Sequence, residues 1–194
     1  MTDNGTAAGC SMDNHNYVVN GFNAGMRGRK GSEYDGGHRV PLFIHWPKGK
    51  LVKGRDIEQL SANIDLLPTL IELCGLTQVE DSKFHGISLA PFIREENKPS
   101  LDRVVVTDSQ RVEQPIKWKQ SATMTQQWRL INGKELYDMQ LDPEQRYDVA
   151  LQNQDIVHNL RQHYEEWWEI VSTRFDEECP IIIGNAQEKC TTLT

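Results

Sequence analysis

The chain has 194 residues, enough for one domain or for one domain with a small appendage. Hydrophobic residues make up 38% of it and charged residues 25%, which is typical of a globular protein. The formal net charge of −7 argues against a nucleic-acid partner. No apolar run approaches the ~20 residues that a membrane-spanning helix requires, which argues against a membrane partner.

The first half of the chain predicts a loop, a strand and a helix. Residues 1–40 are rich in Gly and Asn and lack apolar periodicity, so we expect a long loop, and such loops usually carry function. Val40 to Trp46 is a short apolar run, which predicts a buried strand with His45 as a core histidine. A helix is expected between Asp65, a candidate cap, and Gly75, a natural stop. The spacing of its apolar residues predicts one apolar side, formed by Leu67, Leu70, Ile71 and Cys74.

The second half predicts a β-meander and a long helix. After a short helix or turn at 88–93, strands are expected at 103–108, 120–131 and 134–138. Asn132-Gly133, between the last two strands, is a strong hairpin signal. An amphipathic helix is expected from Asp155, a candidate cap. The apolar side of this helix is predicted to contain Val157, Leu160, Tyr164, Trp167 and Val171. An edge strand is expected at 181–183.

This order of elements predicts an α/β fold: the end of a central sheet followed by a small α+β subdomain, an antiparallel sheet with one long amphipathic helix. We place the α/β part at residues 1–98, the α+β subdomain at 99–175 and an irregular tail at 176–194. The last helix needs an apolar face to dock on, so tryptophans are predicted to build the subdomain core. They are Trp118, Trp128, Trp167 and Trp168.

Asp3-Asn4 is the first candidate site. A carboxylate oxygen and an amide oxygen side by side suit a hard cation such as Ca²⁺ or Mg²⁺. Two ligands are not a site, however, because calcium takes about six to eight oxygens. Taken alone, the pair is more typical of an Asx-turn at the end of a strand.

A second candidate site is the glycine-rich stretch 25–41, which contains three Arg, one Lys and one His. Glycines let the backbone approach a ligand, and cations favour an oxyanion. It is not a P-loop, because Lys30 is followed by glycine. The alternatives are a solvated basic loop for Arg27, Arg29 and Lys30, and an internal Asp35–Arg39 ion pair.

Other polar residues are weaker candidates. His38 fits packing or a hydrogen bond behind the site better than direct contact with a ligand. His15 lies among Asp and Asn residues and could approach a substrate. The end of the 103–108 strand could line a substrate pocket through Asp108, Gln110 and Arg111.

Together, several motifs resemble the C-terminal half of a sulfatase of the arylsulfatase type, in the alkaline-phosphatase-like superfamily. The most specific is Lys30-Gly-Ser-Glu-Tyr-Asp-Gly-Gly-His-Arg-Val-Pro41, and the resemblance covers roughly residues 1–175 in the family's order. Asp35 stands where the family usually has Glu. The other motifs are Asp3-Asn4-Gly5, Asp65 to Leu70, His85 to Leu89, Glu135 to Asp138 and Asp142-Pro143-Glu144.

The resemblance implies a function for three residues. Asp3 and Asn4 match the family's ligands to a divalent metal, usually Ca²⁺, and Lys30 matches the lysine that contacts a sulfate oxygen. The parent enzyme is expected to hydrolyse sulfate esters of a small molecule or glycan with a formylglycine nucleophile. It is expected to be periplasmic or secreted.

The nucleophile motif is the main departure from the family. Formylglycine is made in a Cys/Ser-x-Pro-x-Arg motif, which none of the four cysteines or the serines has. We therefore expect the chain to begin within an active site, to need the N-terminal half of the sulfatase as a partner and to be inactive alone. An unpaired sheet edge also predicts self-association. Cys179 and Cys190 could form a disulfide or remain free thiols.

Two alternatives stay open. The chain could be a free-standing binding or interaction module that kept a sulfatase tail without its chemistry. It could also come from a related phospho- or phosphonate hydrolase, although the Gly-Gly-His38-Arg39-Val40-Pro41 context favours a sulfatase.

Overall fold

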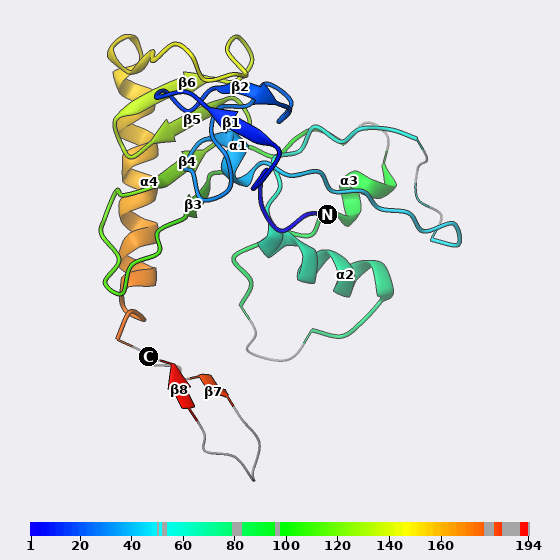
Figure 1. The fold of residues 1–194 in the computed structure, drawn as a ribbon. Helices are drawn as coiled ribbons and strands as arrows, with labels where there is room; N and C mark the ends of the chain where they lie inside the picture. Colours follow the sequence, from blue (N-terminus) through cyan, green and yellow to red (C-terminus); the bar gives the residue numbers. More distant parts are fainter. Residues whose placement is uncertain are drawn as a thin grey trace.

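The computed structural model describes residues 1–49, 51, 54–78, 83–95, 98–176, 181–183 and 191–193. Its elements form an α/β arrangement with three antiparallel sheets (Figure 1). The strands are β1 (Cys10–Met12), β2 (Val18–Gly21), β3 (Val105–Asp108), β4 (Ser121–Met124), β5 (Trp128–Ile131), β6 (Glu135–Asp138), β7 (Ile181–Ile183) and β8 (Thr191–Leu193). The helices are α1 (Asp35–His38), η1 (Asn63–Asp65), α2 (Leu66–Cys74), α3 (Ala90–Arg94), η2 (Ala150–Gln152) and α4 (Gln154–Ser172).

The largest sheet is an antiparallel meander in the order β3-β4-β5-β6. Its last hairpin confirms the predicted Asn-Gly turn: Asn132 and Gly133 have φ values of 51° and 65°, and the Lys134 N–H donates to the Ile131 carbonyl at 2.9 Å. Such left-handed values match the twist of the flanking strands. The predicted meander is confirmed with one correction: residues 120–131, predicted as a single strand, form the two paired strands β4 and β5. The predicted strand at 181–183 is confirmed as β7.

The meander lies between α4 and the N-terminal segment. On one face, Leu130 and Leu136 pack in a buried cluster with Val157 and Leu160 of α4, which runs along the sheet in Figure 1. The opposite face packs in a buried cluster with Tyr34. Its sheet residues are Val105, Ala122, Met124, Ile131 and Tyr137. Apolar side chains thus project from both faces of the meander. The meander therefore forms the centre of the larger hydrophobic core.

Two predictions about helix starts and loops are corrected. The N-cap of α4 is Asn153, and Asp155 lies inside the first turn. Residues 1–40 are not one long loop, because β1 and β2 pair as a hairpin. Its turn is held by the Asp13 carboxylate, which accepts the N–H groups of His15 and Tyr17. A side-chain bond of this kind leaves no periodic signal in the sequence.

The helix α2 exposes most of its predicted apolar side. Leu67 and Leu70 are 55% and 54% exposed and Cys74 is also exposed, whereas Thr69 and Leu73 are buried against the α3 region. The predicted end is confirmed by Gly75, which has φ 63°. The helix is therefore amphipathic as expected, but Leu67, Leu70 and Cys74 of its apolar side are not covered by the described part of the chain.

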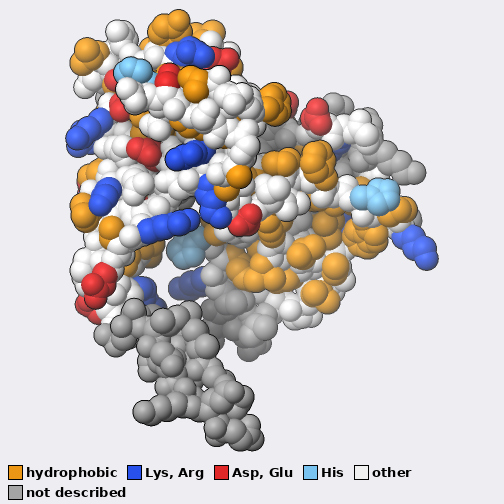
Figure 2. All heavy atoms as spheres, viewed as in Figure 1, with side chains coloured by type: hydrophobic (Ala, Val, Ile, Leu, Met, Phe, Trp, Pro, Cys, Tyr) orange, Lys and Arg blue, Asp and Glu red, His pale blue; other side chains and the backbone are white. Residues whose placement is uncertain are grey.

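The predicted buried strand from Val40 to Trp46 is wrong for this chain. The segment has no strand pairing in the described residues, and residues 41–46 are exposed, with Phe43 at 83% and His45 also exposed. A strand forms only where neighbouring strands satisfy its backbone groups, and no strand of the described residues pairs with this segment. Figure 2 shows hydrophobic side chains gathered on the lobe that carries α2.

No helix among the described residues is long and apolar enough to cross a membrane. Cys179 and Cys190 lie outside the described residues, as does most of the tail beyond Asp176. The boundaries at 98/99 and 175/176 stay predictions.

Candidate functional site

The N-terminal segment is hydrogen-bonded to the loop that carries Lys30. The Lys30 N–H donates to the Thr6 carbonyl at 3.0 Å, and the Gly5 N–H donates to the Gly37 carbonyl at 3.0 Å. The contact is so close that a Cβ on Gly5 would lie 1.9 Å from the Gly36 oxygen. This packing places the Asp-Asn pair and the lysine, predicted from separate motifs, in adjoining backbone segments.

The side chains of Asp3 and Asn4 carry the oxygen atoms that a hard cation prefers, but two ligands are fewer than such a cation needs. The Asn4 amide Nδ2 donates to the Asp3 carboxylate at 2.5 Å, and Asp3 is exposed. The described residues contain no cluster of three or more His, Cys, Asp or Glu side chains placed to hold a metal. A calcium ion needs about six to eight oxygens. The side chains of Asp3 and Asn4 would therefore be only two of the ligands of such a site.

Tight turns hold the Lys30 loop in place. Gly28 and Gly31 have φ values of 84° and 86°, a region that disfavours residues with a Cβ. The Ser32 N–H closes the turn onto the Arg29 carbonyl at 2.8 Å. Lys30 itself is exposed, so the loop fixes its backbone and leaves the ammonium group free to meet an anion.

Arg27 anchors this loop to the meander and is not a solvated cation. Its guanidinium lies 3.9 Å from the centre of the Tyr34 ring, and Nη1 donates to the Tyr137 hydroxyl at 2.8 Å. Burial is the largest influence on its pKa and lowers it, but the pKa is raised overall by the surrounding tyrosines, including Tyr17. Arg27 therefore has a structural function, and the basic-loop interpretation is wrong for it.

Asp35 is a second anchor. Its side chain is fully buried, and Oδ1 accepts from Nε of Arg129 on β5 at 3.0 Å. The Asp35 N–H donates to Oε1 of Gln145 at 2.9 Å. The predicted ion pair with Arg39 is confirmed but is longer, at 3.6 Å, and more exposed. No local pattern predicts the contact with Arg129, because the two residues are 94 positions apart.

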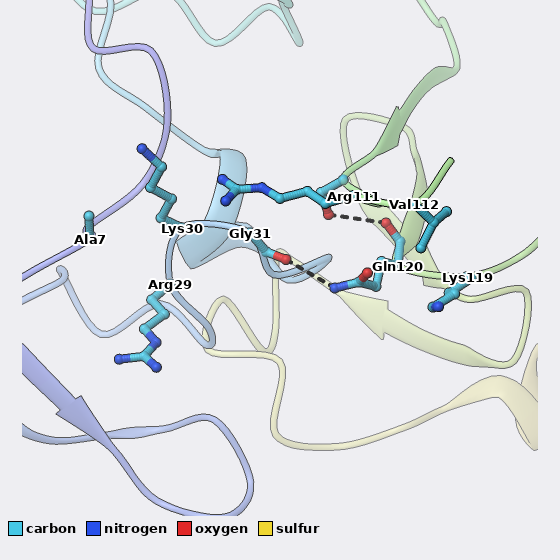
Figure 3. A pocket seen from close by; sticks show the side chains of 9 residues that line it. Ala7, Arg29, Lys30, Gly31, Arg111, Val112, Lys119 and Gln120 are labelled. Carbon is cyan, nitrogen blue, oxygen red and sulfur yellow. Dashed lines mark hydrogen bonds between the residues drawn. The ribbon is translucent and has the colours of Figure 1, made fainter. Parts of the chain in front are cut away.

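A hollow of about 590 Å³ opens beside Lys30 (Figure 3). Four of its lining residues are cations: Arg29 and Lys30 from the glycine-rich loop, and Arg111 and Lys119 from the segment between β3 and β4. The two segments are joined by the Gln120 Nε2–H, which donates to the Gly31 carbonyl at 3.3 Å. The other lining residues are Ala7, Gly31, Ser109, Val112 and Gln120.

Of the remaining candidates, His38, His15 and Asp108 do not line this hollow. His38 is hydrogen-bonded through Nε2 to the Glu33 carbonyl at 3.0 Å, and burial lowers its pKa, which fits a packing function. His15 is exposed, and its neighbour Asn16 lines an adjoining hollow of about 300 Å³ instead. Asp108 accepts from the backbone and side chain of Gln110, while only Arg111 of this group reaches the hollow.

Lys119 is the lining cation that sequence reasoning missed. It follows Trp118, which has φ 66°, and precedes Gln120, which has φ 49°. No periodic pattern marks this irregular segment. The only signal in the sequence is a cluster of basic residues between the strands predicted at 103–108 and 120–131. This cluster does not indicate which loop the basic side chains face.

Known proteins resemble this chain over most of its length. A family model described as N-sulphoglucosamine sulphohydrolase, C-terminal, matches residues 29–169. The steryl-sulfatase of Rattus norvegicus is 36% identical over 73 residues, covering 38% of this chain and 12% of that protein. The Delta 4,5-hexuronate-2-O-sulfatase of Bacteroides thetaiotaomicron is 34% identical over 131 residues, covering 61% and 26%. The chain thus spans about a quarter or less of these relatives.

Solved structures agree in fold. The crystal structure of Ps i-CgsB gives a TM-score of 0.61 at 26% identity, covering 76% of this chain and 32% of that chain. The structure of Ps i-CgsB in complex with k-i-k-neocarrahexaose gives a TM-score of 0.63 at 25% identity with the same coverage. The predicted resemblance to a sulfatase C-terminal portion and the predicted α/β fold class are both confirmed.

Proposed function

Because the chain belongs to the N-sulphoglucosamine sulphohydrolase C-terminal family, we propose that it completes the active site of a sulfuric ester hydrolase. Lys30 contacts a sulfate oxygen of the substrate, and Asp3 and Asn4 provide two oxygens to a divalent metal, Ca²⁺ or Mg²⁺. The observation that carries the proposal is the Lys30 N–H to Thr6 carbonyl bond of 3.0 Å, which joins the lysine loop to the Asp-Asn segment.

The proposed contribution of Lys30 is electrostatic. Breaking the S–O bond of a sulfate ester builds negative charge, and a positioned cation stabilises that charge more in the transition state than in the ground state. A divalent metal, when bound, would polarise a sulfate oxygen. Rigid turns at Gly28 and Gly31 hold the lysine backbone in place, so little reorganisation is needed when the charge develops.

The nucleophile is proposed to come from sulfatase sequence outside this chain. No Cys/Ser-x-Pro-x-Arg motif occurs among its 194 residues, so a formylglycine would have to lie elsewhere. The exposed apolar residues of 42–46 and of α2 support this proposal, because a sulfatase catalytic domain would cover them and extend the sheet. Location in the periplasm or outside the cell stays a prediction from the family.

A chimera tests the proposal. This chain would follow the N-terminal portion of the Bacteroides sulfatase, and hydrolysis of an aryl sulfate would be measured. We expect activity in the chimera and none in this chain alone. Lys30→Ala should lower kcat/KM by roughly 100-fold, as loss of one charge-stabilising group does elsewhere. Lys134→Ala, at an exposed lysine of the β5–β6 turn, is the matched control.

Two outcomes would contradict the proposal. If the isolated chain hydrolysed the aryl sulfate and Lys30→Ala abolished this activity, all the catalytic groups would lie within the chain. If Lys30→Ala kept full activity in an active chimera, the lysine would not contribute to the mechanism. Sulfate titration of the isolated chain, followed by the Lys30 amide resonance in NMR, tests the contact independently of whether the chimera folds. A cooperative, monomeric isolated chain with a specific partner would instead favour the binding-module alternative.

A further inference from the structure

Trp118 has a backbone conformation that bulky residues rarely adopt. Its φ value is 66°, in the left-handed region, and Gln120 in the same segment has φ 49°. A residue with a Cβ is disfavoured there, so the surrounding contacts must hold it in place. Both residues lie between β3 and β4, in the segment that borders the Lys30 loop. A strained backbone beside a candidate site indicates a functional constraint on this segment.

The helix α4 holds both the side chain and the backbone of Trp118. The indole ring stacks on the Tyr164 ring with centroids 3.7 Å apart, and the Trp118 N–H donates to the Tyr164 hydroxyl at 3.0 Å. The indole Nε1–H donates to Oε1 of Glu165 at 3.2 Å, and Lys117 pairs with the same carboxylate. Because Tyr164 is fully buried, these contacts fix the segment to the packed core of the molecule.

The turn between β5 and β6 contacts both the indole ring and the Lys30 loop. A Cβ on Gly133 would lie 2.7 Å from Cε3 of Trp118, so the ring packs directly on the glycine. In the same turn, Nδ2 of Asn132 donates to Oε1 of Glu33 at 3.0 Å, and Oδ1 accepts from the Ser121 N–H at 3.1 Å. The turn therefore connects the region around Trp118 to a residue of the glycine-rich loop.

Gln120 provides the contact nearest to Lys30. Its Nε2–H donates to the Gly31 carbonyl at 3.3 Å, and Figure 3 shows the side chain directed at that oxygen. The Gln120 carbonyl accepts from the backbone N–H and the hydroxyl of Ser109, just beyond β3, at 3.1 and 3.2 Å. Gly31 follows Lys30 directly in the sequence. This contact therefore fixes the backbone immediately next to the lysine.

We propose that Trp118 and Gln120 are positioning residues for Lys30. The contacts of Trp118 with α4 fix Gln120, and Gln120 holds the Gly31 carbonyl, so the lysine loop takes its position from a helix near the other end of the chain. The proposal rests on the proposed function of Lys30 and assigns a positioning function to α4. Misplacing a group of an active site by about 1 Å lowers rates by as much as roughly 100-fold, so such contacts matter without touching the substrate.

Binding of inorganic sulfate to the full 194-residue chain tests the proposal. Sulfate would be titrated while NMR follows the Lys30 amide resonance of the folded chain. Only folded molecules contribute to this resonance, so a variant that merely loses stability keeps its dissociation constant. Exchange of the Ser32 amide, which donates to the Arg29 carbonyl across the turn, reports on the loop itself.

Gln120→Met removes the donor and keeps the length of the side chain. It should weaken sulfate binding by about two- to tenfold, because the loop must then be ordered on binding. It should also speed exchange of the Ser32 amide by about tenfold. The matched control is Gln114→Met, at an exposed glutamine of the same segment, which should change sulfate affinity by less than about twofold.

Variants of Trp118 test whether α4 acts through Gln120. Trp118→Gly removes the ring contacts at a backbone position that glycine accepts, and it should weaken sulfate binding as much as Gln120→Met does. Trp118→Phe keeps a ring on Tyr164 and should restore most of the affinity. Trp118→Gly/Gln120→Met should bind within about twofold of the weaker single variant, because residues that act through one another are not additive. The control Trp128→Ala, at a tryptophan packed against the same buried cluster, should keep the affinity.

The results separate this proposal from the proposed function. If Lys30→Ala weakens sulfate binding and Gln120→Met does not, the positioning function is overturned. Additive losses in the double variant, or an equal loss in Trp128→Ala, would also overturn it. If Lys30→Ala binds sulfate as tightly as the wild type, the proposed contact of Lys30 fails. Exchange of the Ser32 amide in Gln120→Met then decides whether Gln120 holds the loop: faster exchange supports the contact, and unchanged exchange overturns it.

Discussion

The Nε atom of Arg129 lies 3.0 Å from Oδ1 of Asp35, and the Asp35 side chain is fully buried. This contact joins β5 of the meander to α1, the short helix that follows the lysine loop. The glycine-rich loop thus depends on a strand nearly a hundred residues further along the chain for its position.

Replacing Arg129 by Met should destabilise the chain strongly. The variant leaves the Asp35 carboxylate buried without its main partner, and breaking such a buried pair costs about 3–5 kcal/mol. The control Arg39→Met removes the longer, exposed partner at 3.6 Å and should cost at most about 1 kcal/mol. Urea unfolding measures both free energies. If both variants lost the same free energy of unfolding, Arg129 would not stabilise Asp35 more than Arg39 does.

The stability of the chain should fall in mildly acidic solution through His38. Burial lowers the pKa of His38 below its ordinary value of about 6.5. The unfolded chain then binds the proton more readily, so the free energy of unfolding decreases as the pH falls below about 6.5. Comparing urea unfolding at pH 7.5 and pH 5.5 should show a smaller decrease in His38→Gln than in the wild type. The exposed His163→Gln is the control, and an identical decrease in all three chains would contradict this assignment.

Placing a methyl group on Gly5 should detach the N-terminal segment from the lysine loop. The new Cβ would lie 1.9 Å from the Gly36 oxygen, so the backbone must move. The Lys30 N–H would then lose its acceptor at Thr6. Hydrogen exchange should show the Lys30 amide exchanging at least about tenfold faster in Gly5→Ala. The exposed Ala8→Ser serves as the control, and unchanged protection of Lys30 in Gly5→Ala would show that the segment does not depend on this contact.

Self-association of the isolated chain should depend on the segment from Val40 to Trp46. Phe43 and Trp46 are 83% and 40% exposed, and an unpaired apolar segment promotes association. Phe43→Ser/Trp46→Ser should reduce the oligomer fraction in sedimentation velocity without lowering the free energy of unfolding. The control Leu141→Ser/Leu151→Ser changes two leucines that are each 86% exposed elsewhere. A monomeric wild-type chain, or an equal reduction in the control, would contradict the prediction.

Local patterns were enough to predict much of the fold. The Asn132-Gly133 hairpin, the amphipathic helix α4 and the glycine at the end of α2 follow from backbone preferences and from a 3.6-residue period, which act within a few residues. The family was also accessible from the sequence, because the motif from Lys30 to Pro41 is long and specific.

The same patterns failed where an element depends on its neighbours. The run from Val40 to Trp46 has the composition of a buried strand, but composition cannot provide the strand that would pair with it. The spacing predicted the apolar side of α2, but it could not predict that Leu67 and Leu70 are exposed, because amphipathicity shows which side of a helix can be covered and not whether a cover is present.

The sequence by itself determined the meander, the long helix, the family and the proposal of Asp3, Asn4 and Lys30 as site residues. Only the tertiary structure decided that Arg129 neutralises the buried Asp35 and that Lys119 shares a hollow with Lys30. Periodicity and turn chemistry are set by residues close in sequence, whereas the convergence of charges is set by chain segments that meet through packing.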